Sequence, residues 1–350
     1  MDQAVVTNTT DEIKSAVDSA LATIEQERER EIIARRFGLF DRKETLEQIG
    51  ELLGITRERV RQLEKAILTR LKSASGADKI PALGNIERTL IRHLSENGRV
   101  ARVQDLTDWL ITDKKADDRL RAHVGFLAEL SPNLTIIGEN DHYNHAVAIR
   151  EAGDEKKIKS KVDEIVKTIK EHGEPIKAEN LYDKLNYENP NQVRALASVS
   201  KDLTSLKDHW GLIKWPTVNP KNIRDKIYVI LAENGSPMHF SEIAKAIKDS
   251  DFKRKDVTTQ AIHNELIKDK RFVLIGRGIY ALDSWGYSKG TVADIITDVL
   301  KRSGGPTHRD DIVKEVLKSR HVKETTILLN LQSKPQFKRV SRATYELTEK

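Results

Sequence analysis

The chain has 350 residues, of which 38% are hydrophobic, 5% aromatic and 33% charged, and 60 Lys plus Arg against 54 Asp plus Glu give a net charge of +6. The length favours about two or three domains, and the low apolar content favours several small cores over one large core. The absence of cysteine excludes disulfides, thiolate nucleophiles and cysteine-based zinc sites. No segment approaches the ~18 apolar residues of a transmembrane helix, and the polar N-terminus is unlike a signal peptide, so we expect a soluble cytoplasmic protein.

The region 11–73 predicts successive helices, preceded by a flexible N-terminus over residues 1–10. Apolar residues recur through it at the spacing of one helix face. Within it, the segment 27–37 predicts a helix that ends at Gly38, because glycine is the preferred residue directly after a helix.

A helix-turn-helix motif follows. The segment 44–53 predicts a helix that stops at Gly54, and Thr56 is placed to cap a further helix that runs through Leu71. A helix, a glycine-containing turn and a second helix are the parts of that motif. The small polar residues after it predict a linker over 74–84.

The rest of the chain is periodic. Four segments align, each with a Gly followed two positions later by Val or Pro and six positions further by an aliphatic residue: SENGRVARVQDL, KEHGEPIKAENL, AENGSPMHFSEI and KRSGGPTHRDDI. Such self-similarity indicates one supersecondary unit that is repeated. The repeat predicts four small domains, over residues 85–150, 155–218, 221–285 and 289–350.

Each repeat has the order of a winged helix-turn-helix: a helix before the Gly, two helices after it, and a terminal β-hairpin. The hairpin is clearest over 272–282, where two β-rich runs flank Gly276-Arg277-Gly278. In the second repeat the run from Trp210 to Val218 is the predicted wing. The expected fold is therefore mainly α, with a helix-turn-helix followed by a tandem array of four small winged helix-turn-helix (α+β) domains.

The helix over residues 56–72 has the chemistry of a DNA-reading helix, since it carries six basic residues against two acidic ones. In the major groove Arg recognises guanine, Gln recognises adenine and Glu accepts from cytosine. Near the start of the helix the candidate base-reading residues are Arg57, Glu58, Arg61 and Gln62. A solvated helix with ordinary internal ion pairs is the alternative, and the excess of basic residues disfavours it.

The same region resembles region 4 of bacterial primary sigma factors. The resemblance is carried by Glu27-Arg-Glu-Arg-Glu-Ile-Ile, Arg36-Phe-Gly-Leu39, Glu44-Thr-Leu-Glu-Gln-Ile-Gly50 and, above all, Thr56-Arg-Glu-Arg-Val-Arg-Gln-Leu-Glu64. It implies that the four candidate residues read bases, and that the module docks on the β-flap of bacterial RNA polymerase. No segment resembles sigma region 2, so we do not expect a complete sigma factor.

Residues 223–282 resemble the HARE-HTH family, which is also found in the delta subunit of bacterial RNA polymerase. The pattern consists of a helix, NGSPMHFSEIAKAI and VLIGRGIYAL. A cluster of basic residues in this repeat suits phosphate contacts. Across the chain the candidate contacts to the DNA backbone are Arg35, Arg36, Thr45, Arg59, Lys65, Lys253, Arg254, Lys255 and Arg277.

No enzyme motif is apparent. His142 and His145 have a spacing that could chelate a metal, but a second ligand pair is missing and a solvated wing loop is the better interpretation. The glycines around Arg277 lack the rest of a phosphate-binding loop. We therefore expect no catalytic residue, no metal and no cofactor.

Together these patterns predict a nucleoid-associated, sequence-specific transcription factor that reads a −35-like promoter element in double-stranded DNA and associates with RNA polymerase. Neither a membrane nor a small-molecule substrate is an expected partner. One alternative is a polymerase-binding or scaffold regulator, delta-like or a sigma competitor, whose winged helices bind protein. Another is a DNA-recognition accessory subunit of a DNA-modification or defence system.

Overall fold

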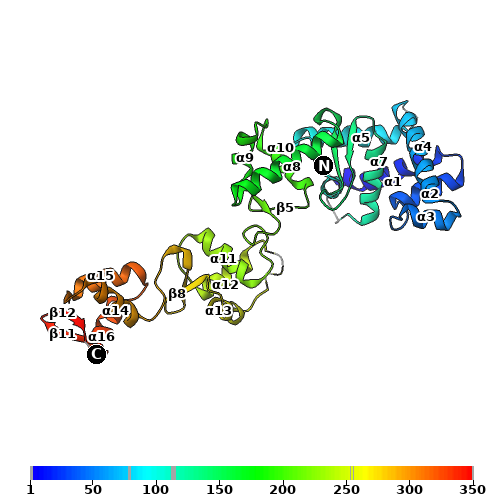
Figure 1. The fold of residues 1–350 in the computed structure, drawn as a ribbon. Coiled ribbons are helices and arrows are strands. Elements are labelled where there is room, and N and C mark those ends of the chain that lie inside the picture. The colour runs from blue at the N-terminus through cyan, green and yellow to red at the C-terminus, as the bar shows by residue number, and fades with distance from the viewer. Residues whose placement is uncertain (1–2, 78–79, 112–115, 253, 255, 349–350) are drawn as a thin grey trace. The chain divides into compact units, whose positions relative to one another are not determined.

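The computed structural model describes residues 3–77, 80–111, 116–252, 254 and 256–348 (Figure 1). It is mainly helical with small antiparallel sheets, which is the predicted composition of secondary structure. The chain divides into two compact bodies, an N-terminal body, Met1–Lys214, and a C-terminal body, Trp215–Lys350. In the part of the chain that the structure describes, no helix has the length and apolar character needed to cross a membrane.

The predicted helix-turn-helix is confirmed. The first four helices are α1 (Gln3–Ala22), α2 (Glu27–Phe37), α3 (Leu46–Leu53) and α4 (Arg57–Gly76). The hydroxyls of Thr45 and Thr56 cap α3 and α4 by accepting from backbone N–H groups in the first turn. Gly54 ends α3 with a φ of 66°, a left-handed conformation that costs glycine nothing. A small core of Ile32, Ile49 and Val60 joins α2, α3 and α4.

Two boundaries differ from the prediction. Helix α1 begins at Gln3, inside the segment expected to be flexible, and it packs on α5 and α7. Helix α4 continues to Gly76, into the predicted linker, because residues 73–75 contain no helix-breaking residue and Leu71 is buried. The next helix, α5, begins at Pro81, in the first turn where proline is tolerated.

The N-terminal body continues with two helix–sheet groups (Figure 1). The first group contains α5 (Pro81–Glu96), β1 (Val100–Arg102), α6 (Val103–Leu110), α7 (Asp118–Leu130), β2 (Leu134–Ile137) and β3 (Ala146–Ile149), and ends in the short helix η1 (Arg150–Ala152). The second group contains α8 (Glu155–His172), β4 (Ile176–Lys177), α9 (Ala178–Leu185), α10 (Pro190–Val199), β5 (Leu203–Leu206) and β6 (His209–Leu212).

The C-terminal body contains two further groups of the same order. The third group comprises α11 (Ile223–Asn234), β7 (Met238–His239), α12 (Phe240–Asp249), α13 (Thr259–Lys268), β8 (Phe272–Gly276), β9 (Ile279–Leu282) and η2 (Asp283–Trp285). The fourth comprises α14 (Val292–Ser303), β10 (Thr307–His308), α15 (Arg309–Ser319), α16 (Glu324–Ser333), β11 (Phe337–Ser341) and β12 (Thr344–Leu347).

Each group has a three-stranded antiparallel sheet in which a short first strand pairs with the last strand, as in the order β1-β3-β2. The first strands have only two or three residues, too few for sequence periodicity to reveal. The hairpin predicted over 272–282 is present as β8 and β9.

The predicted wing of the second group was wrong in position: its hairpin is Leu203–Leu212, and the segment from Trp215 to Val218 is not a strand. The turn is made by Lys207 and Asp208, with φ of 48° and 61°. Turns with two positive φ values usually carry Asn-Gly or Asp-Gly, so the Lys-Asp sequence gives no turn signal.

Within the N-terminal body, α7 joins the helix-turn-helix to the first group. Phe126 on α7 meets Phe37 of α2 edge-to-face, with ring centroids 5.0 Å apart. His123 Nε2 lies 2.7 Å from the carbonyl oxygen of Leu39. Through these contacts α7 packs against the helix-turn-helix as well as within the first group.

The histidines of the N-terminal body predict an acid-sensitive fold. Burial lowers the pKa of His93, His123 and His145 below 6.5, the ordinary value for histidine. Because the unfolded chain then binds more protons below about pH 6.5, stability is fully present above that pH and is lost as the pH falls towards the folded-state pKa values. We expect thermal unfolding of this body at a lower temperature at pH 5.5 than at pH 7.5.

The matched variant is His123→Gln, whose amide keeps a donor for Leu39 but does not titrate. We expect a smaller difference in melting temperature between the two pH values for this variant than for the parent. Equal pH dependence in both proteins would show that His123 makes no contribution.

Candidate nucleic-acid interface

The N-terminal half of α4 presents its polar side to solvent. The side chains of Arg57, Glu58 and Arg61 are 68%, 57% and 55% exposed, and Gln62 is also exposed. The opposite side is anchored, since Val60 and Ile67 are fully buried. The four predicted base-reading residues therefore lie together on one accessible surface.

These four side chains form solvent-exposed hydrogen bonds and ion pairs with one another and with α3. Glu58 accepts from Arg61 Nε and Nη2, at 2.8 and 2.6 Å, and from Gln62 Nε2 at 3.4 Å. The pKa of Glu58 is lowered by its hydrogen bonds from Arg61. Arg57 pairs with Glu47 of α3 at 2.8 Å. Since solvent-exposed ion pairs are worth only about 0–1 kcal/mol, base contacts can replace them.

The C-terminal half of α4 is used for packing. Lys72 forms a 2.6 Å ion pair with Glu129 of α7, and Arg70 pairs with Glu29 of α2 at 2.5 Å. Leu71 is 2% exposed. Through these pairs the C-terminal half of α4 contacts α2 and α7.

The predicted backbone contacts in this module fall into two groups. Arg59 and Lys65 are exposed on α4. Arg35 bridges Glu31 and Glu44 at 2.9 and 2.8 Å.

Arg36 and Thr45 also have internal partners. Arg36 bridges to Glu64 at 3.2 Å and donates to the backbone oxygen of Glu44 at 3.3 Å. Thr45 uses its hydroxyl as the cap of α3, accepting from the backbone N–H of Gln48. Arg35 and Arg36 thus fix α2 against the helix-turn-helix, a role that sequence reasoning missed.

Among the predicted basic residues of the third group, Lys253 and Lys255 lie outside the described residues. Arg254 and Arg277 are exposed, the latter at the turn between β8 and β9. The backbone at Arg254 is fixed by Lys226, whose Nζ donates to the Arg254 carbonyl at 2.7 Å although Lys226 is only 3% exposed.

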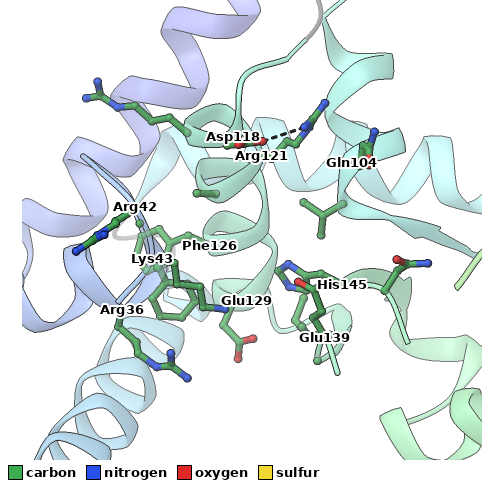
Figure 2. Close-up of a pocket in the computed structure, with 18 of the residues that line it drawn as sticks. Arg36, Arg42, Lys43, Gln104, Asp118, Arg121, Phe126, Glu129, Glu139 and His145 are labelled. Atoms are coloured by element: carbon green, nitrogen blue, oxygen red, sulfur yellow. Dashed lines mark hydrogen bonds and ion pairs between the residues drawn. The ribbon is translucent and has the colours of Figure 1, made fainter. Parts of the chain in front are cut away.

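A groove of about 960 Å³ lies at the junction of the helix-turn-helix and the first group (Figure 2). Arg36, Arg42 and Lys43 lie on one side of Phe126 and His145 on the other (Figure 2). Burial and the nearby charge of Lys43 lower the pKa of His145, which favours its neutral form. Sequence reasoning missed this groove, because only the packing of α7 brings the two segments together.

The structure places the two histidines of the candidate chelating pair in different surroundings. His142 is 72% exposed, while His145 lines the groove described above. No cluster of three or more His, Asp or Glu suited to a metal ion occurs among the residues that the structure describes. The wing loop is also less solvated than expected, because Asn144 donates to the carbonyl of Val199 at 2.8 Å and Tyr143 to Asp163 at 2.5 Å.

A helix-turn-helix whose second helix exposes Arg, Glu and Gln near its N-terminus defines a DNA-binding domain. In agreement, residues 26–73 match the family model described as Sigma-70, region 4. Helix α1 lies before this match and packs instead on α5 and α7.

Two curated relatives illustrate the similarity. The chain is 39% identical over 84 residues to RNA polymerase sigma factor RpoD of Helicobacter pylori (strain ATCC 700392 / 26695), covering 23% of this chain and 11% of that protein. It is also 39% identical over 69 residues to RNA polymerase sigma factor SigA of Bacillus sp, covering 19% of this chain and 18% of that protein. The chain therefore spans less than a fifth of the length of these relatives.

Proposed function

We propose that this chain is a sequence-specific transcription regulator that reads a −35-like promoter element and associates with bacterial RNA polymerase. The observation that carries the proposal is the exposed cluster of Arg57, Glu58, Arg61 and Gln62 on α4, within the segment that matches sigma region 4. Each of these side chain types has a matching base edge in the major groove. By resemblance, the polymerase partner is the β-flap.

The remaining groups extend this function as proposed winged helices over residues 85–150, 155–218, 221–285 and 289–350. Their order of three helices, a short strand and a hairpin supports that assignment. In the proposal, phosphates are contacted by Thr45, Arg59, Lys65, Arg254 and Arg277, together with Lys253 and Lys255. Arg35 and Arg36 would contact phosphate while keeping their internal ion pairs.

The test is selection of duplex DNA from a random library by the full chain. We expect enrichment of one sequence that the wild-type chain binds more tightly than scrambled DNA. Recovery of unselected sequences would contradict base reading by α4. Sedimentation with purified bacterial core polymerase then tests the second partner, and the expected result is a co-sedimenting complex.

Lys65→Ala should separate phosphate contact from base reading. If Lys65 neutralises one phosphate, the slope of log K against log salt becomes less negative by about 0.9. Affinity should fall equally for the selected and the scrambled DNA, which is measured by fluorescence anisotropy over a range of salt concentrations. Lys14→Ala, on α1, is the matched control and should leave the slope unchanged; an unchanged slope for Lys65→Ala would remove this residue from the interface.

A specific observation favours protein contact for the first two groups. Their third helices, α7 and α10, are packed against other parts of the same body. Such packing supports the alternative in which these groups act as a scaffold within a regulator that binds polymerase. In that case, surface charge variants of the first two groups would leave DNA affinity unchanged.

A further inference from the structure

The third helices of the four groups are equivalent position by position. Each buries two residues four positions apart, and the next strand starts six positions after the second of them. The pairs are Val124 and Ala128, Val193 and Ala197, Ile262 and Leu266, and Ile327 and Leu331. The side of each helix opposite this buried pair is its outward face. It consists of three residues, at two positions before, two after and five after the first member of the pair.

In the first group this outward face is Ala122, Phe126 and Glu129, and it is occupied. Phe126 is fully buried against Phe37, Glu129 is paired with Lys72, and Ala122 lines the groove of Figure 2. Helix α7 consequently has no free face on which a base could be read.

In the second group the outward face is Asn191, Ala195 and Ser198, and it lies against the first group. A side chain at Gly98 would come within 2.8 Å of the Ala195 methyl, so only glycine allows this approach. The carbonyl of Ser198 accepts from Asn144 Nδ2 at 3.2 Å. The small residues on this face serve close packing between the two groups.

In the third group the same face is Gln260, Asn264 and Ile267, and all three are exposed. Gln260 Nε2 donates to Asn264 Oδ1 at 3.1 Å, so the two amides lie side by side on one ridge. Ile267 is 65% exposed. The fourth group has Thr325, Leu329 and Gln332 there, without a pair of amides one turn apart.

Exposed basic residues precede and follow the amide ridge in the sequence. Arg254, Lys268 and Arg277 are exposed before, on and after α13. Of the acids in this part of the sequence, Glu265 is paired with Arg224 at 3.1 Å and Asp269 with Arg271 at 2.8 Å, while Asp249, Asp251 and Asp256 are exposed. Arg254 has a φ of 54°, an uncommon left-handed conformation for arginine, and the hydrogen bond from Lys226 to its carbonyl holds it.

We propose that α13 is a second DNA-reading helix of this chain, and that it recognises A·T base pairs in the major groove. Gln and Asn side chains make paired hydrogen bonds to adenine N6 and N7, and an apolar side chain contacts the thymine methyl. Gln260 and Asn264 supply the amides, Ile267 the apolar contact, and Arg254 and Arg277 the phosphate contacts. The inference rests on the proposed DNA-binding function and adds a second recognition element to it.

Selection from a random duplex library by three full-length proteins tests this proposal. The wild-type chain should enrich DNA with two separate conserved segments. The double variant Gln260→Ala/Asn264→Ala should lose the A·T-containing segment and bind the wild-type sequence at least about 5-fold more weakly, the loss expected for a single amide–adenine pair. The control Thr325→Ala/Gln332→Ala, at the two polar positions of the corresponding face of α16, should select and bind as wild type does.

Two outcomes overturn the proposal. One is that the double variant selects the same sequence with the same affinity; the other is that it loses affinity equally for scrambled DNA, which would mean phosphate contact only. The variant Arg61→Ala distinguishes DNA reading by α4 from DNA reading by α13. DNA selected by this variant should lack the conserved segment read by α4 and keep the A·T-containing segment. Loss of that segment alone would support α4 and leave α13 to be judged by its own variant. Unchanged thermal unfolding of the double variant confirms that its fold is intact.

Discussion

Replacing Arg61 by alanine is expected to weaken binding to the selected DNA by about 1–3 kcal/mol and to relax base preference at one position. The Arg61 side chain is 55% exposed, and its guanidinium already donates through two nitrogens to the carboxylate of Glu58. Two parallel N–H donors of a guanidinium can bind guanine O6 and N7 as they bind a carboxylate. Because Arg61 already presents its donors in this way to Glu58, we expect a small entropic cost of ordering the side chain when it binds DNA. Fluorescence anisotropy with each of the four bases at every position of the site measures the loss.

Arg59→Ala is the matched control for Arg61→Ala. Arg59 belongs to the same helix and is equally cationic, and it is one of the residues proposed to contact phosphate; its guanidinium donates to the Gln62 amide oxygen at 3.4 Å. Its loss should weaken all sequences alike and leave base preference intact. If Arg61→Ala also weakens the selected and scrambled DNA to the same extent, Arg61 contacts only the backbone.

The largest effect on stability is expected for Phe126→Ala, which should cost about 3–5 kcal/mol. The ring is fully buried and lies edge-to-face against Phe37, so its removal opens a cavity between α7 and α2. The stability of α2 and of α7 should therefore fall together. Hydrogen–deuterium exchange of peptides from α2 and α7, at increasing urea concentration, measures it.

Phe40→Ala provides the comparison, since it removes the same side chain from the same junction. Phe40 is 56% exposed and its ring has the guanidinium of Arg119 above it, at 5.9 Å from the centroid. We expect a loss of at most about 0.5–1 kcal/mol. If exchange rises in α7 but not in α2 for Phe126→Ala, the two units do not share a common core.

The parts of the fold that local signals determine could be predicted from the sequence. Thr56 and Gly54 mark the start of α4 and the end of α3, because capping depends on residues within one turn. The exposure of Arg57 and Arg61 followed from the same helical periodicity that buries Val60 and Ile67. Hence the candidate reading surface could be named in advance.

What depends on contacts distant in sequence could not be predicted. The pairing of Arg36 with Glu64, and the insertion of Phe126 against Phe37, join segments 28 and 89 residues apart that no local pattern connects. The first strands of the sheets are equally hidden, since β4 has two residues and exists only through its pairing with β6. Lys207 and Asp208 form a turn with residues that rarely occupy it.

The close approach of Gly98 to α10 has a mechanical consequence. Since α4 packs on α7, and β1 of the same group packs directly on α10, side-chain packing runs continuously from α4 to α10 within the N-terminal body. If a bent or overwound duplex rotated α4, we would therefore expect α7 and α10 to move with it. An alanine at Gly98 would place its methyl closer to the carbonyl oxygen of Asn191 than van der Waals contact allows, so it would force the first two groups apart at this contact while the direct contacts of α4 stay in place.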